Sequence, residues 1–159
     1  MKMLAVSALL CAMLALTRAF PAYSWWEPSC PDGWTNVGYR CLLYIPEKMT
    51  WAEAEENCRL DGGSLVAVFE YEQFAEMREL MQKAGHKSGQ VWVGGHKAPE
   101  DSSWSWSDHM SPVMFPNKCP GGPTKENCLK IVIKDDATGC WKDMRCDAEL
   151  PSVCSMFIM

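Results

Sequence analysis

Cysteine is the residue type with the widest chemical range in this chain, which contains nine of them. Thiolates bind metals or act as nucleophiles, whereas cysteines in oxidising compartments form disulfides. Cys11 lies in an apolar stretch near the start of the chain. The other eight are spread over the rest of it: Cys30, Cys41, Cys58, Cys119, Cys128, Cys140, Cys146 and Cys154. We expect four bridges and no spare thiol, but spacing alone does not say which cysteines pair.

Residues 1–19 have the three-part layout of a secretory signal peptide. Lys2 supplies the positive start, residues 3–16 are apolar except for Ser7, and the stretch ends on Thr17-Arg18-Ala19. The apolar run is shorter than the ~20 residues that a membrane-spanning helix needs. We therefore expect cleavage after Ala19 and a soluble, secreted, extracellular product with no membrane insertion.

Charge and composition exclude several classes of function. Without the leader, 13 basic residues face 20 acidic ones and the formal net charge changes from −5 to −7. This balance argues against nucleic acid or an anionic membrane as a partner. His86, His96 and His109 lie far apart, the disulfides consume the thiols, and no serine-hydrolase motif is present. We expect a protein that is not an enzyme.

Two helices are indicated in the first half of a single domain. Thr50 and Glu53 form a capping-box pattern that starts the first helix, and Gly62-Gly63 ends it. The acidic side chains of this helix are expected in solvent, except that the stem of Glu55 falls on the apolar face. Apolar residues at helical spacing predict the second helix, which ends before Gly85: Phe74, Met77, Leu80 and Met81.

Short strands follow, and the fold class is α+β with an antiparallel or mixed sheet. The expected strands are residues 64–68, 90–95, 103–107, 129–133 and 152–156. Residues 30–41 are expected to form a hairpin closed by its own disulfide. Residues 108–127 form a long irregular loop with four prolines, and Cys119 within it and Cys128 directly after it favour a functional loop.

Residues 20–29 precede the domain as a short extended arm, because two prolines prevent regular pairing. The arm contains the pair Trp25-Trp26. Two interpretations remain open for this pair, namely packing back on the domain or contact with a partner or ligand.

Seven motifs in order make residues 30–156 resemble a C-type lectin domain. They are Cys30-Pro-Asp-Gly-Trp34, Trp51 to Cys58, Trp92-Val-Gly-Gly95, Trp104-Ser-Trp106-Ser-Asp108, Glu126-Asn-Cys128, Cys140-Trp-Lys-Asp143 and Pro151-Ser-Val-Cys154. The resemblance implies two helices, antiparallel or mixed sheets and a long disulfide-braced loop. It also implies the pairs Cys30–Cys41, Cys58–Cys154 and Cys128–Cys146, which leaves Cys119 and Cys140 for each other. The narrower likeness is to small secreted fish lectins and type II antifreeze proteins.

In this family, sugar binding usually runs through a calcium ion, which takes about six to eight oxygen ligands. The ligand triplet of the family, Glu-Pro-Asn or Gln-Pro-Asp, corresponds here to Gly122-Pro123-Thr124, and its Asn-Asp pair corresponds to Lys142-Asp143. Glu126 and Asp143 keep ligand character, whereas Lys142 brings an ammonium that we expect between these two carboxylates. The calcium site is therefore degenerate, and we expect no metal and no cofactor.

We favour a calcium-independent, carbohydrate-binding lectin of innate defence or mucus. The candidate sugar-binding residues are Pro123, Thr124, Glu126, Asn127, Lys142 and Asp143. Trp141 or Trp106 would add an apolar face, although each also has an interpretation as a core residue. The glycan is the expected partner, and a non-covalent homo-oligomer stays open.

Two other functions are compatible with the same resemblance. The first alternative is an ice-structuring protein whose flat, rigid surface lies on residues 110–124, including Val113, Met114, Phe115 and Thr124. A loop-swapped dimer of the venom type ranks last, because such proteins usually spend an odd cysteine on an interchain bond.

Overall fold

Two helices and eight strands make up the part of the chain that the computed structural model describes, residues 28–98, 100, 102–108, 117–121 and 124–158. In chain order the elements are β1 (Thr35–Val37), β2 (Arg40–Met49), α2 (Trp51–Leu60), β3 (Ser64–Leu65), α3 (Tyr71–Lys83), β4 (Gly89–Lys97), β5 (Trp104–Trp106), β6 (Cys128–Ile133), β7 (Gly139–Met144) and β8 (Leu150–Phe157). The expected signal peptide, most of the arm, the loop residues 109–116 and Pro123 lie outside the described residues.

The first helix begins at the expected capping box. The backbone N–H of Glu53 donates to the Thr50 hydroxyl at 3.4 Å, and the Glu53 carboxylate accepts from the Thr50 N–H at 2.9 Å. Ala54, Glu55 and Cys58 are the buried residues of α2. The carboxylate of Glu55 accepts the N–H of Leu65 at 2.9 Å, so it fixes the chain that leaves the helix.

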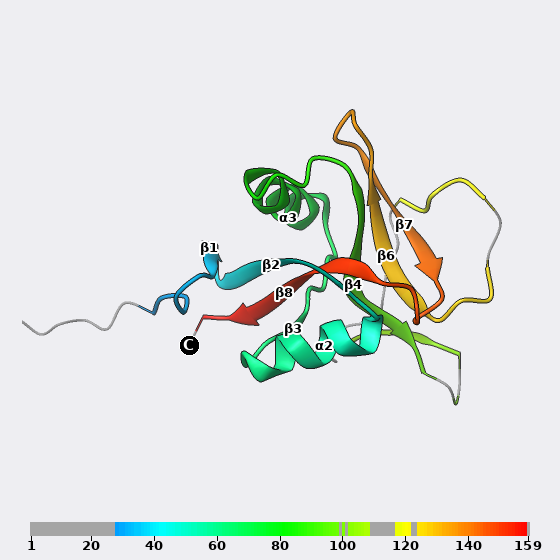
Figure 1. The fold of residues 1–159 in the computed structure, drawn as a ribbon, viewed down its shortest axis with the longest axis horizontal. Helices are drawn as coiled ribbons and strands as arrows, with labels where there is room; N and C mark the ends of the chain where they lie inside the picture. Colours follow the sequence, from blue (N-terminus) through cyan, green and yellow to red (C-terminus); the bar gives the residue numbers. More distant parts are fainter. Residues whose placement is uncertain (1–27, 99, 101, 109–116, 122–123, 159) are drawn as a thin grey trace, which may run out of the picture.

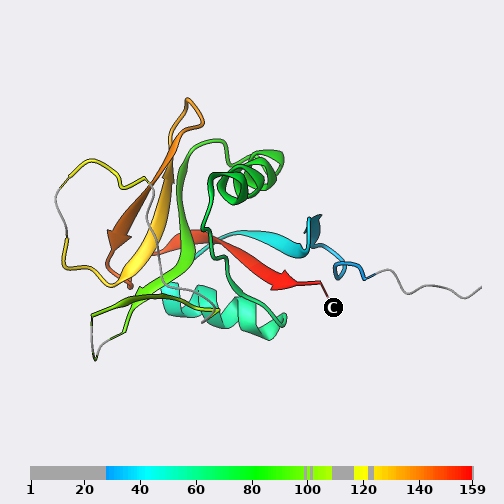
Figure 2. The same cartoon turned by 180° about the vertical axis from the view of Figure 1, so that it is seen from behind.

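The second helix buries the residues at the expected spacing. Phe74, Met77 and Met81 are buried against the core, and Leu80 is partly buried beside them. Figures 1 and 2 show α3 and α2 on opposite sides of the ribbon that β2 and β8 form. The sheet is therefore covered by a helix on each side at this end of the molecule.

All eight strands belong to one sheet with the order β1-β2-β8-β4-β6-β7, and β3 and β5 pair with β8 and β4. The pairing of β4 with β8 is parallel and the others are antiparallel, so the sheet is mixed. The α+β class is confirmed. β6 and β7 follow β4 in the strand order and form one end of the sheet (Figure 1). The candidate site forms on these two strands and at the end of β4, which is Lys97.

Three strand predictions need correction. The expected strand 64–68 is paired only at Ser64–Leu65, while the three residues after it are buried without a ladder. β2 was missed because Pro46 and exposed charges follow Ile45, where the pairing register with β8 shifts. β7 was missed because its charged residues and glycine do not alternate cleanly; it lies at the edge of the sheet.

Four disulfides join the same cysteine pairs that the resemblance implies: Cys30–Cys41, Cys58–Cys154, Cys119–Cys140 and Cys128–Cys146. The Cys58–Cys154 bridge fastens α2 to β8 across 96 residues of sequence. Trp92 is fully buried, and its indole N–H donates to the carbonyl of Met49 at 3.0 Å.

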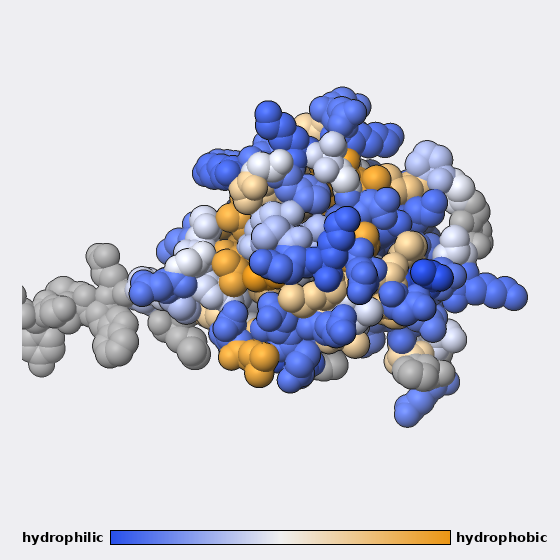
Figure 3. Space-filling model, viewed as in Figure 1, coloured by the Kyte–Doolittle hydropathy of each residue, from blue (hydrophilic) through white to orange (hydrophobic). Residues whose placement is uncertain are grey.

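Hydrophilic side chains cover most of the face seen in Figure 3. Among the described residues, no helix is long and apolar enough to cross a membrane.

Candidate binding site

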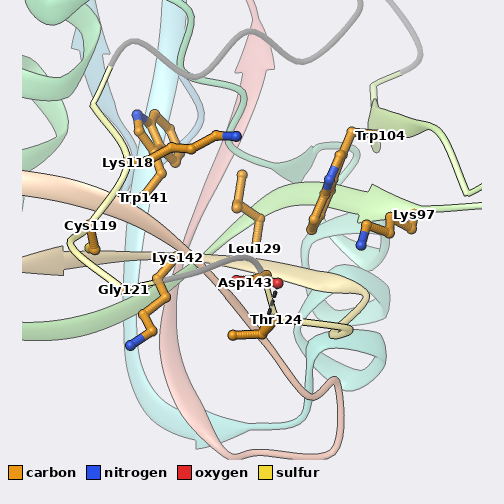
Figure 4. A pocket seen from close by; sticks show the side chains of 10 residues that line it. All are labelled: Lys97, Trp104, Lys118, Cys119, Gly121, Thr124, Leu129, Trp141, Lys142 and Asp143. Atoms are coloured by element: carbon orange, nitrogen blue, oxygen red, sulfur yellow. Dashed lines mark hydrogen bonds between the residues drawn. The ribbon is translucent and has the colours of Figure 1, made fainter.

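A pocket of about 300 Å³ lies where the end of β4, the start of β5 and the middle of β7 meet the braced part of the long loop. Its walls come from Lys97, Trp104, Lys118, Cys119, Gly121, Thr124, Leu129, Trp141, Lys142 and Asp143 (Figure 4). We take this pocket as the candidate binding site because it contains three of the six candidate sugar-binding residues, Thr124, Lys142 and Asp143.

One wall is set by the pairing of β4 with β5. Lys97 and Trp104 are direct partners in this antiparallel register, so their side chains project from the same face. The Lys97 ammonium lies 5.0 Å from the centre of the Trp104 ring, within the range of a cation–π contact. The Lys97 backbone N–H also donates to the carbonyl of Asn127 at 2.8 Å, which fixes the end of β4.

The floor comes from β6 and β7, where Leu129 is the direct partner of Asp143. The hydroxyl of Thr124 donates to the carboxylate of Asp143. This bond joins the returning end of the long loop to the last part of β7 (Figure 4). The pocket therefore has an apolar floor beside a carboxylate that is already oriented by a neutral donor.

The opposite wall is the segment at residues 117–121, which is fastened to β7. The backbone N–H of Cys119 donates to the carbonyl of Trp141, and the N–H of Trp141 donates to that of Asn117, both at 2.8 Å. The Cys119–Cys140 disulfide adds a covalent link at the same place. These three links hold Lys118 beside the pocket.

Trp104 is the more exposed aromatic side chain of the site and was not expected there; of the two expected tryptophans, Trp141 lines the pocket and Trp106 does not. Trp106 is fully buried and Trp141 is 7% exposed. Their rings meet edge to face, with centroids 5.7 Å apart, so both act mainly as core residues. Trp104 is half-buried at the start of β5. The signal that points to it is its place next to the turn between two expected strands, where a hairpin sets it against Lys97.

The structure brings some of the six predicted site residues together and separates others. Thr124, Lys142 and Asp143 line the pocket, but Glu126 and Asn127 do not. Glu126 is half-buried and Asn127 is exposed. Asn127 contributes through its backbone carbonyl rather than its amide. Pro123 is outside the described residues. The wall residues Lys97, Lys118 and Leu129 were not predicted.

Lys142 does not lie between the two carboxylates, which corrects another expectation. It is exposed, and Figure 4 shows its ammonium pointing away from Asp143. Within the described parts of the chain, it forms no ion pair with Asp143 or Glu126. Neighbouring residues of a strand point to opposite faces, so a lysine and an aspartate next to each other in β7 separate.

A fourth lysine lies behind the pocket. Lys130 pairs directly with Lys142 across β6 and β7, is buried, and donates to the amide oxygen of Gln90 at 2.6 Å. Burial lowers the pKa of the Lys130 ammonium, and the charge of Lys142 lowers this pKa further, while Asp143 opposes the shift. Burial is the main cause of this shift, and the charges of Lys142 and Asp143 act on it in opposite directions.

The donors among the described pocket residues are few for a calcium ion. Calcium takes about six to eight oxygen ligands, several of them carboxylates. Here Asp143 accepts from the hydroxyl of Thr124, and Lys142 supplies a positive charge at the neighbouring position. In the described segments, no three His, Cys, Asp or Glu side chains come close enough to hold a metal.

Residues 47–156 match the family model of the lectin C-type domain. The chain therefore belongs to the C-type lectin domain family. It is 35% identical to the type-2 ice-structuring protein of Hemitripterus americanus, over 97% of this chain and 99% of that protein. It is 32% identical to lactose-binding lectin l-2 of Anguilla japonica, over 80% of this chain and 78% of that protein.

Solved structures place the fold in the same group. A calcium-independent type II antifreeze protein superposes with a TM-score of 0.69 and 31% identity, covering 82% of this chain and 96% of that one. Human lithostathine superposes with a TM-score of 0.73 over 87% of this chain and 98% of that one. At 24% identity, this second likeness concerns the fold alone.

Proposed function

We propose that this protein is a secreted lectin that binds a carbohydrate in the pocket beside Trp104 without a calcium ion. The observation that carries the proposal is the combination of an indole wall with the Thr124–Asp143 pair in one concave site. Ligand sites are typically concave and mostly apolar, with a few oriented polar groups. Four disulfides in one small domain support secretion into an oxidising environment.

The two kinds of wall would contact different parts of a sugar ring. The C–H face of a pyranose packs on the indole of Trp104, which offers a large, rigid surface. Thr124 uses its proton on Asp143, so its oxygen is directed as an acceptor for a sugar hydroxyl. The second carboxylate oxygen of Asp143 accepts another hydroxyl. These direct contacts replace the bonds that calcium makes in other members of the family.

Ice structuring is the second candidate function. It is supported by the 35% identity to the ice-structuring protein of Hemitripterus americanus and by the likeness to a calcium-independent type II antifreeze protein. Ice binding needs a flat, rigid surface, whereas the described pocket is hollowed. The loop residues Val113, Met114 and Phe115, which we expected on such a surface, lie outside the described residues. We therefore rank carbohydrate binding first.

The test compares both activities on the same sample. The disulfide-bonded protein is screened on a glycan array and for thermal hysteresis, each in millimolar calcium and in chelator. We expect sugar binding that chelator leaves unchanged. Calcium should also leave the melting temperature unchanged, because a ligand that binds only the folded state raises apparent stability. Thermal hysteresis without glycan binding would move the assignment to ice structuring.

A variant pair ties the activity to the pocket. Trp104→Ala removes the indole wall, and we expect at least a tenfold loss of sugar affinity, about 1.4 kcal/mol, as for a buried aromatic contact. Tyr39→Ala removes an aromatic residue that is 67% exposed and does not line this pocket, so it is the control. Equal affinities in the two variants would place the binding site elsewhere.

A further inference from the structure

Positive charge is concentrated at the pocket of an acidic protein. The whole chain has a formal net charge of −5, yet three of the ten pocket residues are lysines and one is an acid. Building on the lectin function, we propose that the pocket selects glycans that carry an anionic group, a carboxylate or a sulfate, over neutral glycans.

Two of the lysines are held in place from opposite sides. Lys97 is fixed through its backbone bond to Asn127 and through the contact of its ammonium with Trp104. Lys118 belongs to the segment that the Cys119–Cys140 bridge and two backbone bonds fasten to β7. In Figure 4, Leu129 lies between the Lys118 side chain and Trp104. An anion above this floor would lie beside Lys118, with Lys97 on the far side of the Trp104 ring.

Lys142 has a weaker role because of its direction. Its ammonium points away from Asp143 toward the outside of the site (Figure 4). An exposed charge outside the site attracts an anion through solvent. Salt screens this attraction, with a Debye length of about 10 Å at 0.1 M. We therefore assign direct anion contact to Lys118, a supporting positive charge behind the Trp104 ring to Lys97, and long-range attraction to Lys142.

The single carboxylate of the wall does not cancel this charge. Asp143 keeps its negative charge when it accepts from the Thr124 hydroxyl, so it offsets one of the three lysine charges of the lining and two remain. We place the sugar on the Leu129 side of the Trp104 ring, because Lys97 lies on the opposite side of the ring (Figure 4). A sugar ring on this side with an anionic substituent toward Lys118 satisfies both the aromatic and the cationic walls. An acidic peptide would use only the lysines.

The chemistry of lysine predicts which anions are accepted. An ammonium is a compact point charge with rotatable donors, without the planar fork by which arginine selects carboxylates and phosphates. We therefore expect sialylated and sulfated glycans to bind with similar affinity. Both should bind up to about fivefold more tightly than the neutral parent, because an exposed ion pair contributes up to about that factor.

The experiment titrates the full disulfide-bonded protein with lactose, sialyllactose, sulfated lactose and an acidic peptide, at low and at high salt. We expect both anionic sugars to bind more tightly than lactose, an advantage that shrinks with salt, and no peptide binding. Equal affinity for lactose and the anionic sugars would overturn the anion preference and leave the lectin proposal standing. Binding of the peptide as tightly as the sugars would also overturn it. No binding of any sugar, here or on the array, is the failure of the lectin proposal itself.

Variants locate the charge. Lys118→Gln should remove most of the anionic advantage, measured as the ratio of sialyllactose to lactose affinity within the same variant, and Lys142→Gln should remove less of it. Lys87→Gln is the matched control, because it removes the same charge from an exposed residue that does not line the pocket. Equal losses in Lys118→Gln and Lys87→Gln would show that only the net charge matters, and would reject the site.

Discussion

Thr124 and Asp143 join two parts of the pocket that are far apart in sequence. The hydroxyl–carboxylate bond fastens the end of the long loop to β7 and orients the carboxylate toward the cavity. A hydrogen bond to a charged group contributes about 1.5–3 kcal/mol, and the loss falls mainly on the group left without its partner. The bond therefore supports both the shape of the site and its polarity.

The first prediction concerns this pair. Thr124→Val keeps the side-chain shape and removes the donor, so we expect a clear loss of sugar affinity with a fall of only a few degrees in melting temperature. Titration and thermal melting measure the two effects. Thr138→Val is the matched control, because the Thr138 hydroxyl donates to Asp136 at 2.6 Å in an exposed turn outside the pocket. Sugar affinity that falls equally in both variants would contradict a role for Thr124 in the site.

At the scale of elements, the chain that leaves α3 is joined to β2 through Tyr44 and His86. The Tyr44 hydroxyl and Nδ1 of His86 are 2.6 Å apart, and the two rings meet edge to face. Burial lowers the pKa of His86 from 6.5. The unfolded chain therefore binds a proton more readily than the folded chain does in the range below pH 6.5. The stability from neutral His86 is present above that pH and is lost as the pH falls toward the lower, folded-state pKa.

The second prediction follows from this direction. Between about pH 7 and about pH 5.5, the melting temperature of the natural protein should fall more than that of His86→Gln, because the glutamine side chain does not bind a proton in this range. Tyr44→Phe should keep the pH dependence, because burial rather than the tyrosine is the cause. Parallel melting curves for the natural protein and His86→Gln would contradict the assignment.

Sequence patterns predicted the elements whose signals are local. The capping box at Thr50 starts α2, and the spacing of Phe74, Met77 and Met81 marks α3, because both depend on residues three or four apart. β2 and β7 depend on partners far along the chain. Their charges and Pro46 hide the alternation that a strand needs when it is judged alone.

The candidate site was predictable only where a motif marked it. Thr124, Lys142 and Asp143 follow from the family pattern, but the direction of Lys142 depends on the pleat of β7. Trp104 and Trp106 lie two residues apart on one strand and share a face, so in the sequence only the neighbouring turn marks Trp104, and tertiary packing is what buries Trp106.

For the whole molecule, the four disulfides divide into global and local constraints. Cys58–Cys154 closes a loop of 96 residues, whereas Cys119–Cys140 spans 21 residues beside the pocket. In the chain-entropy model a longer loop gives more stabilisation, and loss of a native bridge from a small secreted domain costs about 2–5 kcal/mol.

The third prediction separates these constraints. Replacing Cys58 and Cys154 by Ala should prevent stable folding or lower the melting temperature severely. Replacing Cys119 and Cys140 by Ser should leave a cooperative unfolding transition but reduce sugar affinity, because Lys118 loses its covalent anchor. Circular dichroism melting and glycan titration measure both outcomes. Full sugar affinity without the Cys119–Cys140 bridge would show that the backbone bonds to β7 are sufficient.

The described chain begins and ends on the same side of the molecule. The Cys30–Cys41 bridge lies near β1, and the N–H of Ile158 donates to the carbonyl of Tyr39 at 3.1 Å, whereas β7 and the segment at 117–121 lie at the other end (Figure 1). A tag, a fluorophore or a multimerising module fused after Met159 would therefore leave the pocket facing outward. Several copies on such a scaffold would engage a dense glycan coat together, so that weak single contacts sum to avid attachment.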